Sequence, residues 1–176
     1  MSEYISDEEQ MNRFSEWWNE HGTSLLIAVG LAIASIAGWN FYSTNRQQNL
    51  EASTALYAEY VDAAAEAKAA IAQQIKTEFP GTSVHSLVAL DEAKKAADDE
   101  NLAAAIQALV EARDAAPDAL LAELAMIRLA KIQYAQGNAE EALQTLQGIR
   151  NPGYQSWALE LTGDIYLAEG NSEQAH

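Results

Sequence analysis

The pattern of apolar and polar positions separates one uninterrupted apolar stretch from a longer region with helical periodicity. Residues 23–42, TSLLIAVGLAIASIAGWNFY, contain no Asp, Glu, Lys or Arg. Twenty residues of helix, at about 1.5 Å each, span roughly 30 Å, which is the thickness of the hydrocarbon core of a bilayer. Aromatic residues, which favour the water–lipid interface, flank the stretch on both sides: Trp17, Trp18, Trp39, Phe41 and Tyr42. The pattern predicts a transmembrane helix over 23–42.

Two other interpretations of this stretch are a buried core helix and a signal peptide. A domain this small rarely surrounds a helix that is apolar on every face. Signal peptides begin with a basic region, whereas residues 1–22 contain six acidic residues and one base, Arg13. We therefore expect an uncleaved anchor. The positive-inside rule does not orient it, because Arg13 on one side is balanced by Arg46 on the other.

The N-terminal region also contains two candidate contact faces. Within the span, Gly30, Ala34 and Gly38 recur every four residues, and small residues at this spacing let another transmembrane helix approach closely. Small residues are common in such spans, so chance spacing is the alternative. Before the span, the spacing of apolar residues predicts a short amphipathic helix within 1–22, with one face formed by Met11, Phe14 and Trp18.

Beyond Arg46 the pattern is helical to the end of the chain. The periodicity predicts one long helix over about 47–78, closed by Phe79-Pro80-Gly81, and a second helix over about 83–98. No segment alternates apolar and polar residues as a half-buried strand would. The sequence therefore predicts an all-α protein.

The last third of the chain repeats itself. The segment QGNAEEAL at 136–143 returns 33 residues later as EGNSEQAH at 169–176. In each copy the Gly is expected to end one helix and the Asn to cap the next. A period near 34 residues is typical of tetratricopeptide helical hairpins. A looser earlier copy has its second helix over 102–115. The alternative is two unrelated alanine-rich hairpins. Because residue 176 falls within a second helix, we expect the domain to be C-terminally incomplete.

The repeat also predicts a binding groove. The first helix of each tetratricopeptide hairpin lines the concave face of the stack. In this register Lys94, Lys131 and Asp164 occupy one groove-facing position, and Leu124, Tyr134 and Trp157 occupy neighbouring positions. Such a groove favours an extended or helical apolar segment. The alternative is that Tyr134 and Trp157 pack between helices.

Composition narrows the function further. The net charge is −16, and the ten Lys and Arg residues are scattered, which argues against nucleic acid binding. The chain has no cysteine, so disulfides and thiolate metal sites are excluded. The three histidines are far apart in the sequence and no known catalytic motif occurs. We therefore expect no cofactor, no metal site and no enzyme.

The order of these segments resembles one bacterial family, the ancillary subunits of the SecYEG translocon. The most specific matches are GWNFYSTNRQQNLEAS, KTEFPGTSVHSLVAL and QGNAEEAL. The resemblance implies a single-pass inner-membrane protein with a cytoplasmic N-terminus and a periplasmic helical domain. It implies association with SecYEG and with a membrane-anchored periplasmic chaperone of the peptidyl-prolyl isomerase type, to hand over translocating polypeptides.

Three parts are therefore expected: a cytoplasmic tail with a short amphipathic helix over 1–22, a transmembrane helix over 23–42, and a tetratricopeptide-like domain over 43–176. The predicted function is a membrane-anchored interaction protein that links the translocon to periplasmic chaperones. The alternative is a tetratricopeptide scaffold that faces the cytoplasm and recruits soluble partners.

Overall fold

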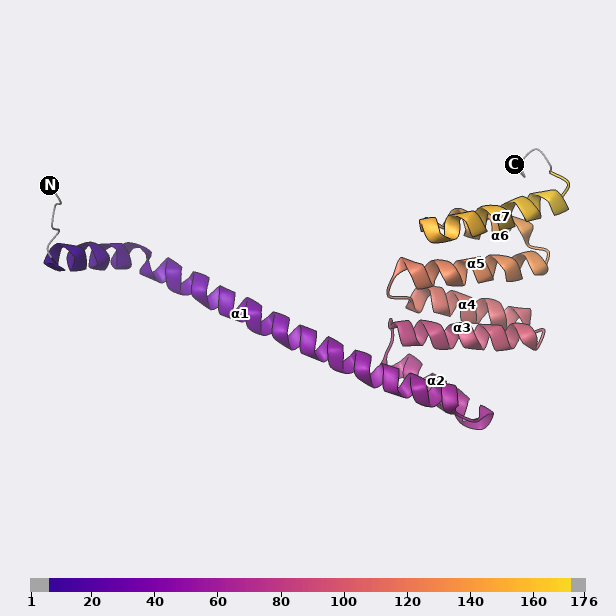
Figure 1. Cartoon of the computed structure of the whole chain (residues 1–176), viewed down its shortest axis with the longest axis horizontal. Coiled ribbons are helices and arrows are strands. Elements are labelled where there is room, and N and C mark those ends of the chain that lie inside the picture. Colours follow the sequence, from indigo (N-terminus) through magenta and orange to yellow (C-terminus); the bar gives the residue numbers. More distant parts are fainter. Residues whose placement is uncertain (1–6, 172–176) are drawn as a thin grey trace. The chain divides into compact units, whose positions relative to one another are not determined.

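The computed structural model describes residues 7–171, in which every regular element is an α-helix (Figure 1). The chain divides into two compact units, Met1–Gln48 and Asn49–His176. The prediction of an all-α protein is confirmed. The helices are α1 (Asp7–Asp62), α2 (Ala65–Glu78), α3 (Ser83–Asp98), α4 (Leu102–Ala115), α5 (Ala119–Ala135), α6 (Ala139–Gln147) and α7 (Pro152–Ala168).

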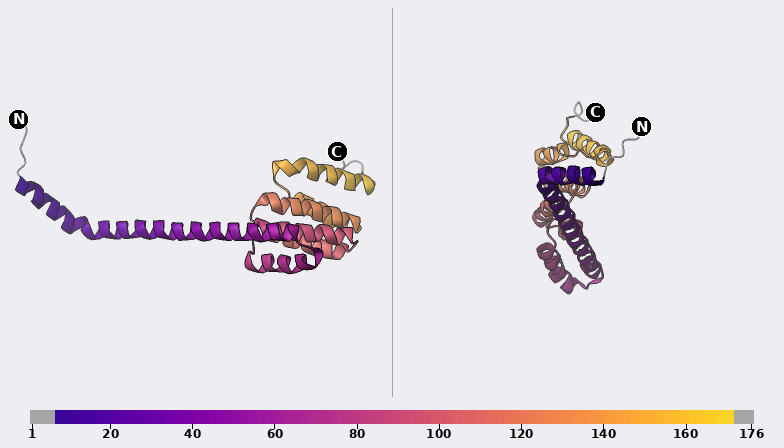
Figure 2. Two further views of the ribbon diagram at one scale, coloured as in Figure 1. Left: turned by 60° about the horizontal axis from the view of Figure 1, so that its bottom comes forward. Right: turned by 90° about the vertical axis from the view of Figure 1, so that its left-hand side faces the viewer.

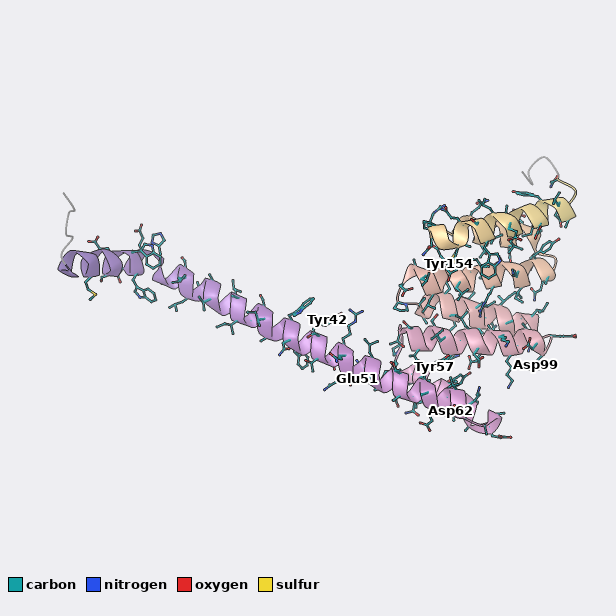
Figure 3. The ribbon with its side chains drawn as sticks, viewed as in Figure 1. Tyr42, Glu51, Tyr57, Asp62, Asp99 and Tyr154 are labelled. Atoms are coloured by element: carbon teal, nitrogen blue, oxygen red, sulfur yellow. The ribbon has the colours of Figure 1, made fainter. Side chains whose placement is uncertain are left out.

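The first unit contains the apolar part of α1. This part is long and apolar enough to cross a membrane, and none of its most apolar window is buried against the protein. Leu26, Ile33 and Ile36 each expose more than 60% of their surface, and Tyr42 points away from the helix (Figure 3). A core helix would bury these side chains, so their exposure argues against that alternative. The apolar surface is of the kind that needs lipid or another protein to cover it.

The expected helix over 47–78 is wrong, because the chain breaks at Ala63 and Ala64 into α1 and α2. The cause is burial. Tyr60 at the end of α1 packs in one cluster with Ile75 near the end of α2, together with residues of α3. A continuous helix would hold Tyr60 and Ile75 more than about 20 Å apart along its axis. Only a reversal of the chain allows both side chains to be buried.

The predicted helices over 83–98 and 102–115 are confirmed as α3 and α4. Side chains cap both N-termini: the Thr82 hydroxyl accepts a hydrogen bond from the His85 N–H at 3.2 Å, and Asn101 Oδ1 accepts one from the Ala104 N–H at 3.2 Å. These bonds satisfy backbone donors that a helix start leaves free. Asp118 caps α5 in the same way.

The same kind of turn follows the first helix of successive hairpins. Gly137 and Gly170 have φ values of 85° and 80°, in the left-handed region that glycine adopts without strain. After each of them, an Asn N–H reaches back to the preceding helix, as in a Schellman motif: Asn138 to Gln133 O at 2.9 Å, and Asn171 to Tyr166 O at 2.8 Å.

The turn after α3, next to Asp99 in Figure 3, has the same form. There Glu100 takes the glycine position with φ of 57°, and the Asn101 N–H donates to Ala96 O at 2.8 Å. The structure therefore contains three equivalent turns where the sequence repeat indicated two. One detail of the prediction is wrong: the Asn138 side chain makes no capping hydrogen bond to α6.

Three apolar clusters hold the second unit together. One joins α1, α2 and α3, a second joins α3, α4 and α5, and a third joins α5, α6 and α7. The small residues Ala105, Ala130 and Ala142 are fully buried, and their size lets neighbouring helices cross closely. The expected second helix after Asn171, including Ala175, lies outside the described residues.

Candidate partner-binding groove

The first helices of the hairpins form a continuous row. Helix α3 contacts α5, and α5 contacts α7, while α4 and α6 lie beside them as the second helices. Figure 1 shows α3, α5 and α7 in this order, and the left view of Figure 2 shows the same succession. This is the arrangement expected of tetratricopeptide hairpins, in which residues of the first helices share one face. Five of the six predicted groove residues lie on α5 and α7 and one on α3.

A hollow of about 230 Å³ opens between α3, α4 and α5. Its floor is apolar and includes the buried side chains of Leu90 and Leu109. Three exposed cationic residues also line it: Lys94, Arg128 and Lys131. Within the described part of the chain, no ion pair joins Lys94 or Arg128 to a carboxylate. The hollow therefore combines an apolar floor with unpaired positive charge.

A second hollow, of about 190 Å³, adjoins the first and shares Leu90, Lys94 and Arg128 with it. Leu124 and Tyr57 line this second hollow (Tyr57 is labelled in Figure 3). The structure therefore brings the predicted groove residues Lys94, Leu124 and Lys131 to adjoining hollows.

The predicted residues Lys131 and Trp157 meet across α5 and α7. The Lys131 Nζ lies 4.8 Å from the centre of the Trp157 ring, within the range of a cation–π interaction. Trp157 leaves 41% of its surface exposed. An exposed aromatic ring next to a cation can contact a partner without disrupting the core.

The other two predicted groove residues lie differently. Tyr134 is half-buried and packs against the cluster of α5, α6 and α7, which is the placement that the alternative interpretation expected. Asp164 is exposed on α7 and lines neither of the two hollows. The six residues thus do not form one continuous site.

Sequence reasoning missed Arg128, which lines both hollows. A signal for it was present. Arg128 precedes Lys131 by three residues on α5, so the two side chains share a helical face. Placing one on the groove places the other there too.

A cluster of charged residues links α2, α3 and α4 away from the two hollows. The Lys76 ammonium donates hydrogen bonds to Glu92 and to Glu111, the latter at 2.8 Å, and His85 Nε2 lies 3.0 Å from Glu111. Burial alone raises the pKa of Glu111, but hydrogen bonds from Lys76 and His85 outweigh it and hold the pKa below its usual value. Each of the four side chains has a structural partner within the cluster.

The pKa of Lys76 shifts the other way. Burial alone lowers it, but hydrogen bonds to Glu111 and Glu92 outweigh that effect and raise the pKa above its usual value. Tyr60 has a raised pKa because of burial and because its hydroxyl donates to Asp91 at 2.7 Å. The pKa shifts of Tyr60, Lys76 and Glu111 arise from burial and from hydrogen bonds between helices, as expected of residues that stabilise helix contacts.

A buried carboxylate, Glu123, holds the connection between α6 and α7. Only 6% of its surface is exposed, and its two oxygens accept the backbone N–H groups of Arg150 at 3.0 Å and Asn151 at 2.8 Å. A buried charge is stable only when hydrogen-bonded in this way. Glu123 therefore has a structural role that the sequence pattern did not indicate.

The apolar part of α1 carries the other predicted contact residues. A Cβ atom added at Gly30 or Gly38 would meet nothing within 4 Å apart from its chain neighbours and the backbone of its own helix, so the space beside both glycines is open. Ala34, on the same face, is exposed. Among the residues whose side chains the structure describes, no three His, Asp or Glu side chains could hold a metal ion.

Comparison with known proteins tests the resemblance. A protein of Haemophilus influenzae named ancillary SecYEG translocon subunit is 28% identical over 178 residues, covering 99% of this chain and 87% of that protein. Proteins of the same name from Aggregatibacter actinomycetemcomitans and Escherichia coli are 28% and 24% identical over 99% of this chain, and cover 87% and 86% of their own length. No solved structure matches significantly.

The resemblance to ancillary translocon subunits is therefore confirmed. Residues 15–176 also match the tetratricopeptide repeat-like domain family, which covers the hairpins and the apolar part of α1. The helical hairpins, the recurrent turn and this match agree, and the chain belongs to the tetratricopeptide repeat-like domain family.

Proposed function

We propose that this protein is a membrane-anchored ancillary subunit of the SecYEG translocon that links it to periplasmic chaperones. The observation that carries the proposal is the similarity to proteins of that name over 99% of the chain, which includes the apolar helix as well as the hairpins. A shared hairpin domain alone would support only a general scaffold. Similarity that extends through the anchor supports a shared location.

The proposed organisation has three parts. Residues 1–22 form a cytoplasmic tail, 23–42 cross the inner membrane once, and 43–176 form the periplasmic domain. Because α1 runs unbroken from Asp7 to Asp62, the short amphipathic helix expected before the span is not a separate element but the start of α1. The exposed apolar side chains of α1 support the span, because water would not favour so large an apolar surface. The row of α3, α5 and α7 then faces partners in the periplasm, among them a membrane-anchored chaperone of the peptidyl-prolyl isomerase type and emerging polypeptides.

Topology is the first test. Alkaline phosphatase and a cytoplasm-active fluorescent protein are fused separately after residue 176, and both fusions are expressed in a bacterial host. The proposal expects phosphatase activity and a dark fluorescent fusion, with the domain accessible to protease in spheroplasts. The matched control places the same reporters before residue 1 and expects the opposite pattern. A cytoplasmic C-terminus in an inserted protein would favour the scaffold that recruits soluble partners.

Association is the second test. The tagged full-length chain is solubilised in mild detergent, and copurifying SecY and chaperone are quantified. The control replaces residues 23–42 with an unrelated single-pass span of equal length. Copurification of SecY with the natural chain is expected. Absence of SecY from the natural chain, when the chain is inserted and folded, would overturn the proposal.

We further propose that Gly30, Ala34 and Gly38 form the face of the span that contacts another transmembrane helix. The open space at both glycines supports this, because the chain itself does not fill it. A Gly38→Leu variant should reduce SecY copurification severalfold. Ala32→Leu is the matched control, since it adds a similar bulk nearly opposite on the helix. Equal losses in the two variants would argue against a specific face.

A further inference from the structure

The two adjoining hollows beside α3 and α5 carry an unusual concentration of positive charge. In a chain of net charge −16, three of its ten Lys and Arg residues converge here: Lys94, Arg128 and Lys131. Lys131 is engaged with the ring of Trp157, while Lys94 and Arg128 have no carboxylate partner among the described residues. A local excess of positive charge on an acidic protein selects for a negatively charged partner.

One carboxylate does line the second hollow. Asp91 lies there with Lys94 and Arg128, and it already accepts a hydrogen bond from the Tyr60 hydroxyl. One carboxylate cannot neutralise two cations. The surface around the two hollows therefore retains a net positive charge.

The size of the hollows limits what they can hold. Volumes of about 230 and 190 Å³ lie below the roughly 300–1,000 Å³ that is usual for small-molecule sites. Each has room for about one large apolar side chain. The floor of the first is formed by Leu90, Leu109 and Ile132, which would pack against such a side chain.

Two adjoining hollows of this size suit a polypeptide segment. An extended segment can place successive anchors in neighbouring pockets while its backbone crosses the helices. Carboxylates next to the anchors would then reach the cations at the edge of the hollows. Affinity would come from the apolar anchor, and selectivity from the charges.

We propose that these hollows bind an extended acidic segment of a partner polypeptide, in which a large apolar residue is flanked by Asp or Glu. The recognised segment lies within the partner chain rather than at its C-terminus. The reason is that the cations come from two helices and flank an apolar floor, so they can pair with carboxylates on both sides of an apolar residue. The inference rests on the proposed function for the periplasmic role of the groove, but it concerns the chemistry of the segment that is recognised.

The test uses the full-length chain in nanodiscs of phosphatidylcholine, a zwitterionic lipid with no net charge. The probe is a short fluorescein-labelled, C-terminally amidated peptide with one Leu flanked on both sides by Asp residues, and binding is followed by anisotropy. The double variant Lys94→Glu, Arg128→Glu should weaken binding at least about tenfold, because attractive pairs are replaced by repulsive ones. High salt should weaken binding of the natural chain as well.

Matched variants separate charge from shape. Lys95→Glu makes the same charge change as Lys94→Glu alone, on the same helix α3 but at a residue that lines neither hollow, and should alter affinity by less than about twofold. Ala97→Leu fills part of the first hollow without changing charge, and should weaken binding severalfold. Circular dichroism of each variant confirms that it is folded.

Several results would overturn the inference. These are equal effects of Lys95→Glu and the double variant, equal binding of a peptide with Gly in place of Leu, or equal binding of a peptide with Lys in place of Asp. Tighter binding of the free-acid peptide than of the amide would assign the site to a C-terminal carboxylate instead. Self-association of the natural chain with the same charge dependence would assign it to a second copy.

The two proposals fail independently. If SecY copurifies with the natural chain but the charge variants bind the peptide normally, the inference fails and the proposed function stands. If the peptide binds with the expected charge dependence but SecY does not copurify, the proposed function fails while the recognition chemistry stands.

Discussion

Replacing Glu100 with Gly should stabilise the hairpin domain. Glu100 is held at φ of 57°, whereas the two equivalent turns place Gly137 and Gly170 there. A left-handed backbone brings the Cβ of an L-residue too close to its carbonyl oxygen, which costs about 1–2 kcal/mol. Glycine has no Cβ and avoids this strain.

The net gain is smaller than the strain. Glycine loses more backbone freedom on folding than other residues, which offsets roughly 0.5–1 kcal/mol. The Glu100 side chain is exposed and makes no ion pair among the described residues, so its removal should lose no contact. It also follows Asp98 and Asp99 directly, and one fewer negative charge relieves repulsion. We expect a net stabilisation of about 0.5–1 kcal/mol.

The assay is urea and thermal unfolding of the full-length chain in detergent, followed by far-ultraviolet circular dichroism. The Glu100→Gly variant should raise the melting temperature of the hairpin domain by roughly 1–4 °C. Glu100→Gln removes the charge but keeps the Cβ, and so measures the repulsion alone. Gly137→Ala makes the reverse change in the equivalent turn and should destabilise. If Glu100→Gln stabilises as much as Glu100→Gly, backbone strain is not the cause.

Three further predictions concern the packed side chains. Glu123→Gln should lower the free energy of unfolding by about 1–3 kcal/mol, because it leaves one backbone N–H without its acceptor. The measurement is the urea midpoint, and the control is Glu160→Gln at an exposed position, which should barely change it. The lowered pKa of Glu111 means that its stabilising contribution is present above the ordinary pKa of Glu and lost as the pH falls through the folded-state value. Stability measured from neutral pH to about pH 3 should therefore decline less in Glu111→Gln than in the natural chain. Tyr134→Ala should lower the melting temperature more than Trp157→Ala, which should instead weaken chaperone crosslinking. If the melting temperature of Tyr134→Ala equals that of the natural chain, Tyr134 contributes little to the core.

Local sequence signals account for much of the fold. The boundaries of α3 and α4 could be predicted because Thr82 and Asn101 are capping residues placed directly before each apolar run. The break after Asp62 could not, because Ala63 and Ala64 are strong helix formers and favour continuation. The burial of Tyr60 with Ile75, a long-range contact, overrides that preference.

The groove could be predicted only in part. The repeat register placed Lys94 and Lys131 on the first helices, and both line the first hollow. The hollows themselves depend on how α3, α4 and α5 pack, which no local pattern encodes. Tyr134 shows the same limit, since its position in the repeat allows both a groove and a core placement and the packing of α6 and α7 determines which occurs.

The uneven burial of the helices has a consequence for motion. Helix α3 buries six residues along its length, whereas α7, one residue longer, buries two, Ala158 and Ile165. Segments with few buried contacts open locally at low free energy while the rest of the domain stays folded. Amide hydrogens of α7 should therefore exchange with solvent well before those of α3. A partner that bridges Lys131 on α5 and Trp157 on α7 would slow that exchange, so α7 would report occupancy of the surface that it shares with α5.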